Sequence, residues 1–403
     1  MRSYFYKSLL VALPILLTFL SCDSTTEVRF ANEKIVNLPF VDSIGFASIT
    51  GDTLRFDPPL SGEYLSHQTY NDQKQHLWIG LKSEYYRLDI YSLDEKRALG
   101  SIQFDSEGPD GIKGGIDGFY FHNSDTIFLL SNEANRVYLM NERSKIVDIF
   151  DFSNVPLPDG FSEYDAYANQ GLKNGPVYVA SNNTLQFYTY RWLKSSEDNF
   201  DYQAFASYSI VERKFVSIYG NYPQNYVRGN NFILYNDPLL AVVDTLSFVQ
   251  FGASEYLAAY NNKTGDLLYV SNEHCEHWKG APEALPMRGE FQKESDWLIE
   301  QPAYPVLLHD ENNKIIYRFL KHKQPLLNID GLLNERWFGP WCISMYNYGL
   351  KRVGHYELPK NALLPVIAFT ALDDLWIKNP SLPPDENSIM FYRFKPTINE
   401  NGQ

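Results

Sequence analysis

The sequence contains little of what several protein classes require. Its 403 residues include only three cysteines, too few for a scaffold held together by many disulfides. Lysine and arginine number 35 against 49 aspartate and glutamate residues, so the net charge is −14 and no basic surface for nucleic acid is expected. No Walker loop, dinucleotide-binding glycine motif or Gly-x-Ser-x-Gly elbow occurs. The sequence therefore predicts no nucleic-acid partner and no cofactor, and it identifies no catalytic residue.

Long apolar segments are also rare, and the one that occurs lies at the N-terminus. Arg2 and Lys7 come before an apolar segment of 13 residues, 8–20, which is short for a transmembrane helix. Ser21 and Cys22 follow this segment directly. The order of charge, apolar run, small residue and cysteine resembles the signal of bacterial lipoproteins, in which cleavage leaves the cysteine as a lipidated N-terminus.

This resemblance implies a location for the protein. Residues 1–21 would be a signal peptide, Cys22 the lipidated residue and 22–30 a polar tether. The body would be extracytoplasmic and anchored by its lipid to the cell envelope, with the outer membrane as the expected place. The alternative is an ordinary secretory signal or a short anchor, in which Cys22 has no special role.

The composition of the body favours an all-β fold. Aromatic residues make up 15% of the chain, with 29 tyrosines and 26 phenylalanines, and these residue types favour strands. No stretch keeps a helical period of 3.6 residues. A fold of two β-sandwiches would need a linker near the middle, and no Pro/Gly/Ser-rich tract of that kind occurs. A single domain over residues 31–397, followed by a tail over 398–403, is therefore expected.

An aromatic strand, a polar turn and a second strand recur along this body. Each copy is typical of a β-hairpin, and the copies lie at 88–104, 137–152, 208–219, 256–270 and 341–358, with a half copy at 389–394. Further strand pairs between them, at 119–130, 176–192 and 306–319, would complete four-stranded units. Such a unit takes ~40–50 residues in a β-propeller. Longer intervals between copies need insertions, for which 194–204 and 276–302 are the candidates.

These repeats predict a β-propeller with six four-stranded blades, although seven are possible if residues 28–60 hold more than one strand. The half copy at 389–394 lacks an outer strand, and the strand-like segment 34–40 near the N-terminus has no partner nearby. Pairing the two would close the ring and remove both exposed sheet edges. We therefore expect an N-terminal strand to complete the last blade.

With these features assembled, the chain resembles the six-bladed β-propeller lipoproteins of Bacteroidota catalogued as domain of unknown function 4221. The signal ending in Cys22 is one common feature. The others are a loop similar to the family's Gly-Pro loop, made of Glu107, Gly108, Pro109, Asp110 and Gly111, and a strand pair similar to the family's, marked by Asp310, Tyr317 and Arg318. The family has no established activity, so the resemblance implies fold and location but no chemistry.

The acidic residues of this loop allow two interpretations. Asp105, Glu107 and Asp110 alternate as they do in some Ca²⁺-binding loops. However, Pro109 interrupts the series and no glutamate closes the loop at the twelfth position. A turn between blades, shaped by Pro109 and the following Asp-Gly pair, is therefore favoured.

The sequence His274-Cys275-Glu276-His277 is a second candidate. Its residue types could bind a metal, but on a strand His274 and Glu276 would face one side while Cys275 and His277 face the other. A disulfide between Cys275 and Cys342 is permitted in an oxidising compartment. Metal, disulfide and free thiols stay open at this point, with two unpaired cysteines favoured and no metal expected.

Trp278 and Trp297 lie in the long insertion at 276–302, outside the strand pattern. Exposed rings there would suit a ligand platform together with His274 and His277, whereas buried rings would pack against their own blade. Overall, the sequence predicts a binding or scaffolding module for a carbohydrate, a peptide or another envelope protein. The alternative is a propeller enzyme, either a metal-dependent lactonase-like protein or a glycan-cleaving hydrolase, with carboxylates lining its channel.

Overall fold

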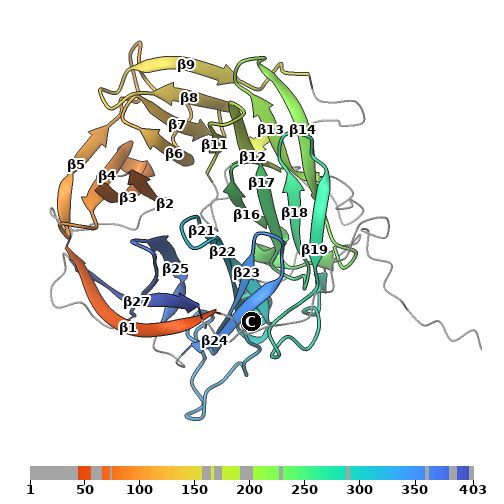
Figure 1. Ribbon diagram of the computed structural model, residues 1–403. Coiled ribbons are helices and arrows are strands. Elements are labelled where there is room, and N and C mark those ends of the chain that lie inside the picture. Colours follow the sequence, from red (N-terminus) through yellow and green to blue (C-terminus); the bar gives the residue numbers. More distant parts are fainter. Residues whose placement is uncertain are drawn as a thin grey trace, which may run out of the picture.

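The computed structural model describes residues 44–55, 66–72, 75–156, 165–167, 175–190, 203–226, 230–286, 291–358, 363–380 and 388–398. Six antiparallel blades surround a central axis in this part of the chain, which confirms the six-bladed propeller (Figure 1). The predicted signal peptide, Cys22 and the tether lie outside the described residues, as does most of the insertion predicted at 194–204.

The first three blades follow the chain from the inside of the ring outward. Blade 1 contains β2 (Ser66–Asp72), β3 (Gln75–Lys82), β4 (Arg87–Ser92) and β5 (Arg97–Gln103). Blade 2 contains β6 (Gly118–Asn123), β7 (Thr126–Ser131), β8 (Arg136–Met140) and β9 (Ile146–Asp151). In blade 3, the short strands β10 (Asp165–Tyr167) and β11 (Val177–Val179) both pair with β12 (Thr184–Tyr190), which is followed by β13 (Gln203–Ser209) and β14 (Lys214–Asn221).

The remaining blades repeat this order, except that the last one takes its outer strand from the other end of the chain. Blade 4 contains β16 (Pro238–Val243), β17 (Leu246–Phe251), β18 (Leu257–Asn261) and β19 (Leu267–Ser271). Blade 5 contains β21 (Ala303–Asp310), β22 (Ile315–Lys321), β23 (Trp341–Asn347) and β24 (Arg352–Leu358). Blade 6 contains β25 (Leu364–Ala371), β26 (Asp374–Lys378), β27 (Ser388–Ile398) and β1 (Ile44–Arg55).

The predicted hairpins form the third and fourth strands of blades 1 to 5, and the half copy is the third strand of blade 6. Their central tyrosines accordingly lie on β4, β8, β13, β18, β23 and β27, and they are Tyr91, Tyr138, Tyr208, Tyr260, Tyr346 and Tyr392. The turn between β18 and β19 uses Gly265 at φ +80°, where a Cβ atom would lie 2.9 Å from the Ile218 carbonyl oxygen. Both the positive φ and the close approach require glycine there.

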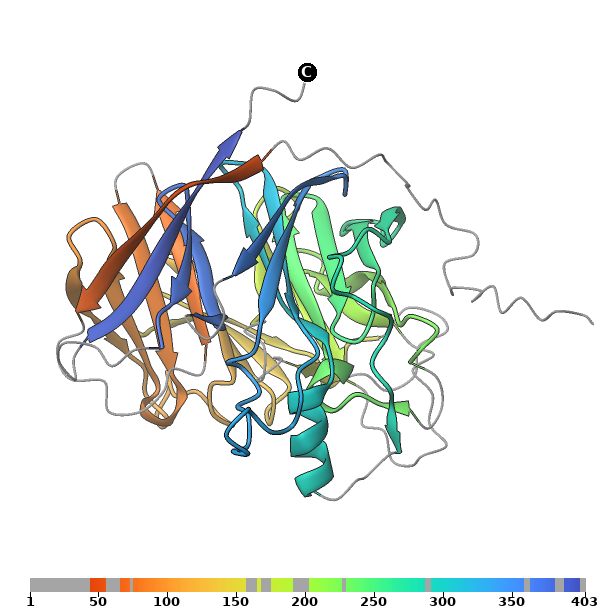
Figure 2. The ribbon, with the colours of Figure 1, turned by 90° about the horizontal axis from the view of Figure 1, so that it is seen from below.

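An N-terminal strand closes the ring as predicted, but the strand is not the expected one. β1 pairs antiparallel with β27 along its length, with Ile49 opposite Phe394 and Leu54 opposite Ile389. Figure 2 shows the two strands side by side. Residues 34–40, which we expected in this position, lie outside the described residues. Closure gives β27 a partner on its outer edge and so removes an unpaired sheet edge.

Several short elements lie between the blades. They are η1 (Ser83–Tyr85), β15 (Asn230–Asn231), η2 (Ile233–Asn236), β20 (Leu285–Pro286) and the helix α1 (Phe291–Glu300). The sequence pattern did not predict α1, which stands on one face of the ring within the 276–302 insertion (Figure 2). The buried Lys321 amine donates hydrogen bonds to the carbonyls of Ile299 and Gln301, each at 2.8 Å, and so holds the C-terminal end of the helix.

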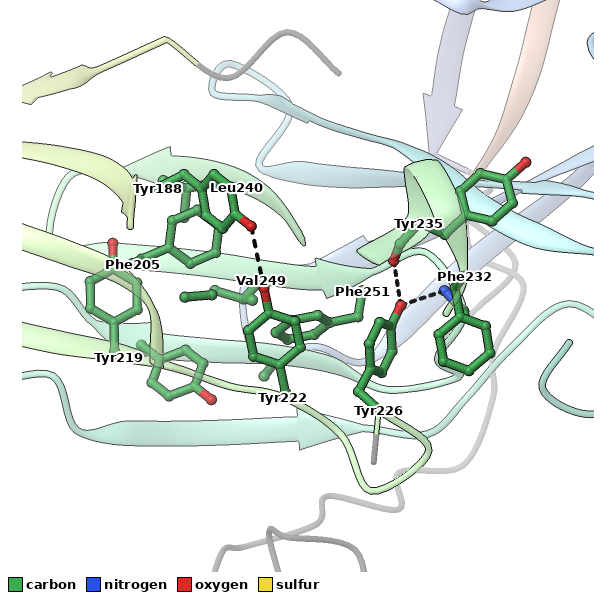
Figure 3. Close-up of a cluster of buried hydrophobic side chains, with 14 of the residues drawn as sticks. Tyr188, Phe205, Tyr219, Tyr222, Tyr226, Phe232, Tyr235, Leu240, Val249 and Phe251 are labelled. Atoms are coloured by element: carbon green, nitrogen blue, oxygen red, sulfur yellow. Dashed lines mark hydrogen bonds between the residues drawn. The ribbon is translucent and has the colours of Figure 1, made fainter. Parts of the chain in front are cut away.

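Most of the core lies between neighbouring blades. Between blades 3 and 4 it is rich in tyrosine, as Figure 3 shows. We call Tyr188, Tyr219, Tyr222, Tyr226 and Tyr235 the tyrosine cluster. Burial of these large rings stabilises the junction, and several of their hydroxyls are bonded: the Tyr226 hydroxyl donates to the Tyr235 carbonyl at 2.5 Å and accepts from the Ala253 amide at 2.9 Å.

Candidate functional site

A central cavity of about 2000 Å³ lies in the described part of the chain, surrounded by the blades. The innermost strand of every blade contributes to its wall, namely β2, β6, β11, β16, β21 and β25. Its volume exceeds the ~300–1,000 Å³ of common small-molecule pockets. Half-buried aromatic rings line it, among them Tyr120, Tyr178 and Trp337. The propeller thus surrounds a cavity that is large enough for an extended ligand.

Polar groups from opposite sides of the ring line this cavity. Tyr120 lies on β6 in blade 2, whereas His309 and Glu311 lie at the end of β21 in blade 5. Burial, together with the negative charge of Glu311, raises the pKa of Tyr120 to about 12. Burial also lowers the pKa values of His122 and His309, so both imidazoles are neutral at neutral pH. The wall therefore offers neutral hydrogen-bonding groups beside aromatic rings.

Two of the acidic residues on the cavity wall are engaged in turns. Asp310 accepts hydrogen bonds from the amide and the side chain of Asn313, at 3.0 and 2.7 Å. Asp373 accepts a hydrogen bond from the Asn312 side chain at 2.8 Å. Such contacts are typical of turn chemistry.

The two tryptophans of the 276–302 insertion are buried, with 4% and 5% of their surface exposed for Trp278 and Trp297. Trp278 packs against Tyr304, with ring centroids 4.9 Å apart. Trp297 lies on α1 against Phe232 and Tyr235 of the core between blades 3 and 4, and its indole nitrogen donates to the Glu283 carbonyl at 2.6 Å. Neither ring lines the central cavity. The structure thus favours the packing interpretation over the ligand platform.

The four residues His274 to His277 divide between two places. The His274 imidazole lies 3.9 Å from Glu255. Cys275 forms a disulfide with Cys342, with Cα atoms 6.9 Å apart, which corrects the expectation of two unpaired cysteines. The chain turns after Cys275, where the Trp278 amide donates to the Cys275 carbonyl, and the His277 Nε2 atom lies 3.2 Å from Glu357. The segment is thus a turn and not the strand on which alternating faces are expected, and it places His274 and His277 beside different carboxylates.

His277 reaches a group of side chains from blade 5, and together they form what we call the histidine cluster: His277, His322, His355 and Glu357. The Nε2 atoms of His277 and His355 lie 3.2 and 2.8 Å from the same Glu357 oxygen, and His322 Nε2 lies 3.8 Å from the other oxygen. The imidazoles of His277 and His322 are stacked, with centroids 4.2 Å apart. Burial, together with the neighbouring His277 and His355, lowers the pKa of His322 to about 4.

Strand register brings the cluster together beside the disulfide. Cys342 on β23 pairs with Glu357 on β24, and Ser344 pairs with His355, so Cys342, His355 and Glu357 share one face of the sheet. His322 directly follows β22. No local sequence pattern indicates this site, because its members are 33 or more residues apart along the chain except for His355 and Glu357. His355 and Glu357 are two residues apart on a predicted strand, and this spacing alone could have indicated that their side chains lie on the same face of the sheet.

The residues of the family-like loop and strand pair have structural roles. Asp110, in the loop from β5 to β6, accepts hydrogen bonds from the Lys145 amine at 2.7 Å and the Ile146 amide at 3.1 Å, and the lysine contact lowers the pKa of its carboxyl. The Gly111 amide donates to the Gly108 carbonyl across Pro109. These bonds are those of a turn between blades, and Glu107 is exposed beside them.

The strand pair anchors blade 5 to blade 4. Arg318 is fully buried, lies 3.5 Å from the centroid of the Tyr304 ring and donates to the Ser254 and Glu273 carbonyls, at 2.9 and 3.3 Å. Tyr317, one residue earlier on β22, is fully buried in the core between blades 5 and 6. Tyr317 and Arg318 therefore stabilise the fold and do not line the cavity, whereas Asp310 does line it.

Comparison with known proteins agrees with this architecture. The profile of the family described as domain of unknown function DUF4221 matches residues 48–329, which is more than half of the chain. The chain belongs to the DUF4221 family. A family member from Bacteroides vulgatus is similar in structure, with a TM-score of 0.68 at 15% identity over 89% of this chain and 99% of that one.

A second similar structure is a protein of Bacteroides fragilis that is described as a candidate exported protein. It has a TM-score of 0.51 at 10% identity, over 90% of this chain and 98% of that one. At these identities the likeness shows the fold alone. No curated protein sequence matches this DUF4221 chain. Among its described residues, no helix has the length and apolar character needed to cross a membrane.

Proposed function

We propose that this DUF4221 protein is a lipid-anchored, extracytoplasmic propeller that binds an oligosaccharide in its central cavity. The observation that carries the proposal is the cavity of about 2000 Å³ lined by all six blades. A sugar chain needs flat apolar surfaces for its ring faces and many hydrogen-bonding groups for its hydroxyls. Tyr120, Tyr178 and Trp337 offer the first, and His122 and His309 are among the groups that offer the second.

Two observations support the location. The N-terminal order of positive charge, apolar segment and Cys22 is typical of lipoprotein signals. The disulfide between Cys275 and Cys342 suits an oxidising compartment outside the cytoplasm. The similarity to a candidate exported protein is in line with both. Mass spectrometry of the mature N-terminus should find an acylated Cys22, and Cys22→Ser should move the protein out of the membrane fraction. An unmodified Cys22 would refute the anchor and leave the cavity proposal intact.

Binding is tested with the purified full chain, calorimetry and a panel of envelope and host oligosaccharides. Tyr120→Ala and Trp337→Ala should each weaken binding about tenfold, the loss expected from removing one stacking ring. Tyr269→Ala is the matched control, because this ring is 39% exposed on β19 and does not line the cavity. Equal affinities in all three variants, or binding of peptides but of no sugar, would contradict the proposal.

The alternative of a glycan-cleaving or lactonase-like enzyme has less support. Of the described carboxylates on the cavity wall, Asp310 and Asp373 are engaged by neighbouring asparagines in turns, as shown above. Glu311 is exposed and close enough to Tyr120 to raise its pKa. Release of reducing ends from a bound oligosaccharide, lost in Glu311→Gln, would favour the enzyme instead.

A further inference from the structure

We propose that the histidine cluster binds one divalent transition-metal ion of the zinc class, with His277, His322, His355 and Glu357 as its ligands and the disulfide intact. The site lies at the junction of blades 4 and 5, and none of the four residues lines the central cavity. The inference is therefore independent of the oligosaccharide proposal.

The spacing of the ligand atoms supports this inference. Zinc lies about 2.0–2.2 Å from imidazole nitrogen and carboxylate oxygen in tetrahedral sites, so neighbouring ligand atoms are about 3.3 Å apart. The three imidazole nitrogens lie 3.2, 2.8 and 3.8 Å from the oxygens of Glu357. An ion bound at the Glu357 carboxylate would therefore have all three imidazole nitrogens close to it.

The hydrogen bonding of the cluster is incomplete in a way that a metal ion would explain. His322 is only 7% exposed, and its Nε2 atom has no hydrogen-bond partner among the described residues. Buried polar atoms are nearly always paired, so each exception needs an explanation such as an ion. His322 Nε2 is directed at the Glu357 carboxylate, where the ion would lie.

The charge and chemistry of the ligands define the metal class. An ion-pair cluster would require several protonated imidazoles side by side, and their like charges repel one another. Neutral imidazoles with one carboxylate have a net charge of −1, which suits a dication. Imidazole favours zinc, copper and nickel over calcium and magnesium. The thiols of Cys275 and Cys342 are consumed in the disulfide, although their sulfur atoms, His322 Nε2 and a Glu357 oxygen all lie within 4.8 Å of one another.

Four protein ligands leave no open position, which is typical of a structural metal site rather than a catalytic one. His277 belongs to the segment after β19 of blade 4, and the other three ligands come from blade 5. The ion would therefore clamp that segment onto blade 5 next to the disulfide, which joins the same two parts.

The test uses the full chain, purified without reductant, stripped with a chelator and dialysed. Titration with ZnCl₂ should show one ion bound per chain, and cobalt should give the visible absorption of a four-coordinate site. His322→Ala, His355→Ala and Glu357→Gln should each lower zinc affinity about 100-fold or more. Zinc should also raise the melting temperature of the unaltered protein but not that of these variants.

Two further variants keep the test decisive. The His277 side chain is 51% exposed, so His277→Ala should fold normally and still lose zinc affinity. His274→Ala is the matched control, because His274 neighbours the cluster in sequence but its side chain lies by Glu255. Wild-type affinity in His277→Ala together with His322→Ala would overturn the proposal. So would binding that occurs only after reduction, since the ligands would then be the thiolates of Cys275 and Cys342.

Discussion

Blade 4 is joined to its two neighbours by different means. At the junction with blade 3, the tyrosine cluster fills the space with large rings, and the Tyr219 hydroxyl donates to Gln186 at 2.9 Å and lies 3.0 Å from the Ser247 hydroxyl. At the outer part of the junction with blade 5, a disulfide, the buried Arg318 and the histidine cluster connect the two blades. Both junctions bury apolar side chains, and the junction with blade 5 adds a covalent bond and polar contacts to that burial.

The two junctions show that different kinds of contact stabilise different parts of the ring. Aromatic packing needs rings from both blades and so continues the strand pattern of the repeats. The segment after β19 and α1 interrupts that pattern between blades 4 and 5, and a small group of side chains, Cys275, Trp278, Tyr304, Leu320 and Cys342, packs there. We infer that the disulfide compensates for this interruption of the strand pattern.

The largest effect is expected from removing that covalent bond. The disulfide closes a loop with a sequence separation of 67 residues, for which chain entropy predicts a contribution of about 4 kcal/mol. The double variant Cys275→Ala/Cys342→Ala should therefore be less stable by about that amount in chemical denaturation. Reduction of the unaltered protein should produce a similar loss. If neither change lowers stability, the bond does not compensate for anything at this junction.

A smaller loss should follow from disturbing the tyrosine cluster. Tyr226→Phe removes a hydroxyl that donates to the Tyr235 carbonyl and accepts from the Ala253 amide, and leaves both groups buried without it. The expected cost is about 1–3 kcal/mol, measured by denaturant unfolding. Tyr269→Phe, at an exposed ring of β19, is the control and should be neutral. Equal stability in both variants would mean that water replaces the lost hydroxyl at Tyr226.

The two junctions also differ in how far the sequence could predict them. The tyrosines of the repeats are local signals, and those on β4, β8, β13, β18, β23 and β27 lie where the hairpin pattern predicted. The closing strand was placed too early because β1 (IGFASITGDTLR) is poor in aromatic residues and its register depends on β27. Helix α1 was missed because its buried residues, Trp297, Leu298 and Ile299, are consecutive instead of spaced by three or four.

The histidine cluster could not be predicted for a different reason. Its members become neighbours only through the register of β23 against β24 and through the turn after Cys275. No periodicity in one segment contains that information. The cavity wall is similar, since Tyr120 and Glu311 line one cavity only because the ring closes.

The smallest expected effect is a pH dependence of stability at the junction of blades 3 and 4, caused by an acidic group at the edge of the tyrosine cluster. The Tyr188 hydroxyl donates to Asp237 at 3.1 Å, and burial raises the pKa of the Asp237 carboxyl from 3.8 to about 6. Its folded-state pKa is thus above the unfolded one, so stability is fully present below about pH 4 and decreases as the pH rises through about 6. Asp237→Asn removes this penalty and retains an acceptor for Tyr188.

The variant should therefore match the unaltered protein near pH 4 and be more stable by about 1–2 kcal/mol at pH 8. This gain is smaller than the free energy that the raised pKa of Asp237 would give in full, because the residue keeps some contact with solvent. Thermal unfolding measured across this range checks the difference, with Asp125→Asn, at an exposed turn between β6 and β7, as the control for loss of one charge. A gain at pH 8 in Asp237→Asn alone would show that the tyrosine junction holds an ionised group at a cost. A gain of equal size in both variants would instead indicate relief of the overall negative charge, and a loss at pH 8 would mean that ionised Asp237 stabilises the junction.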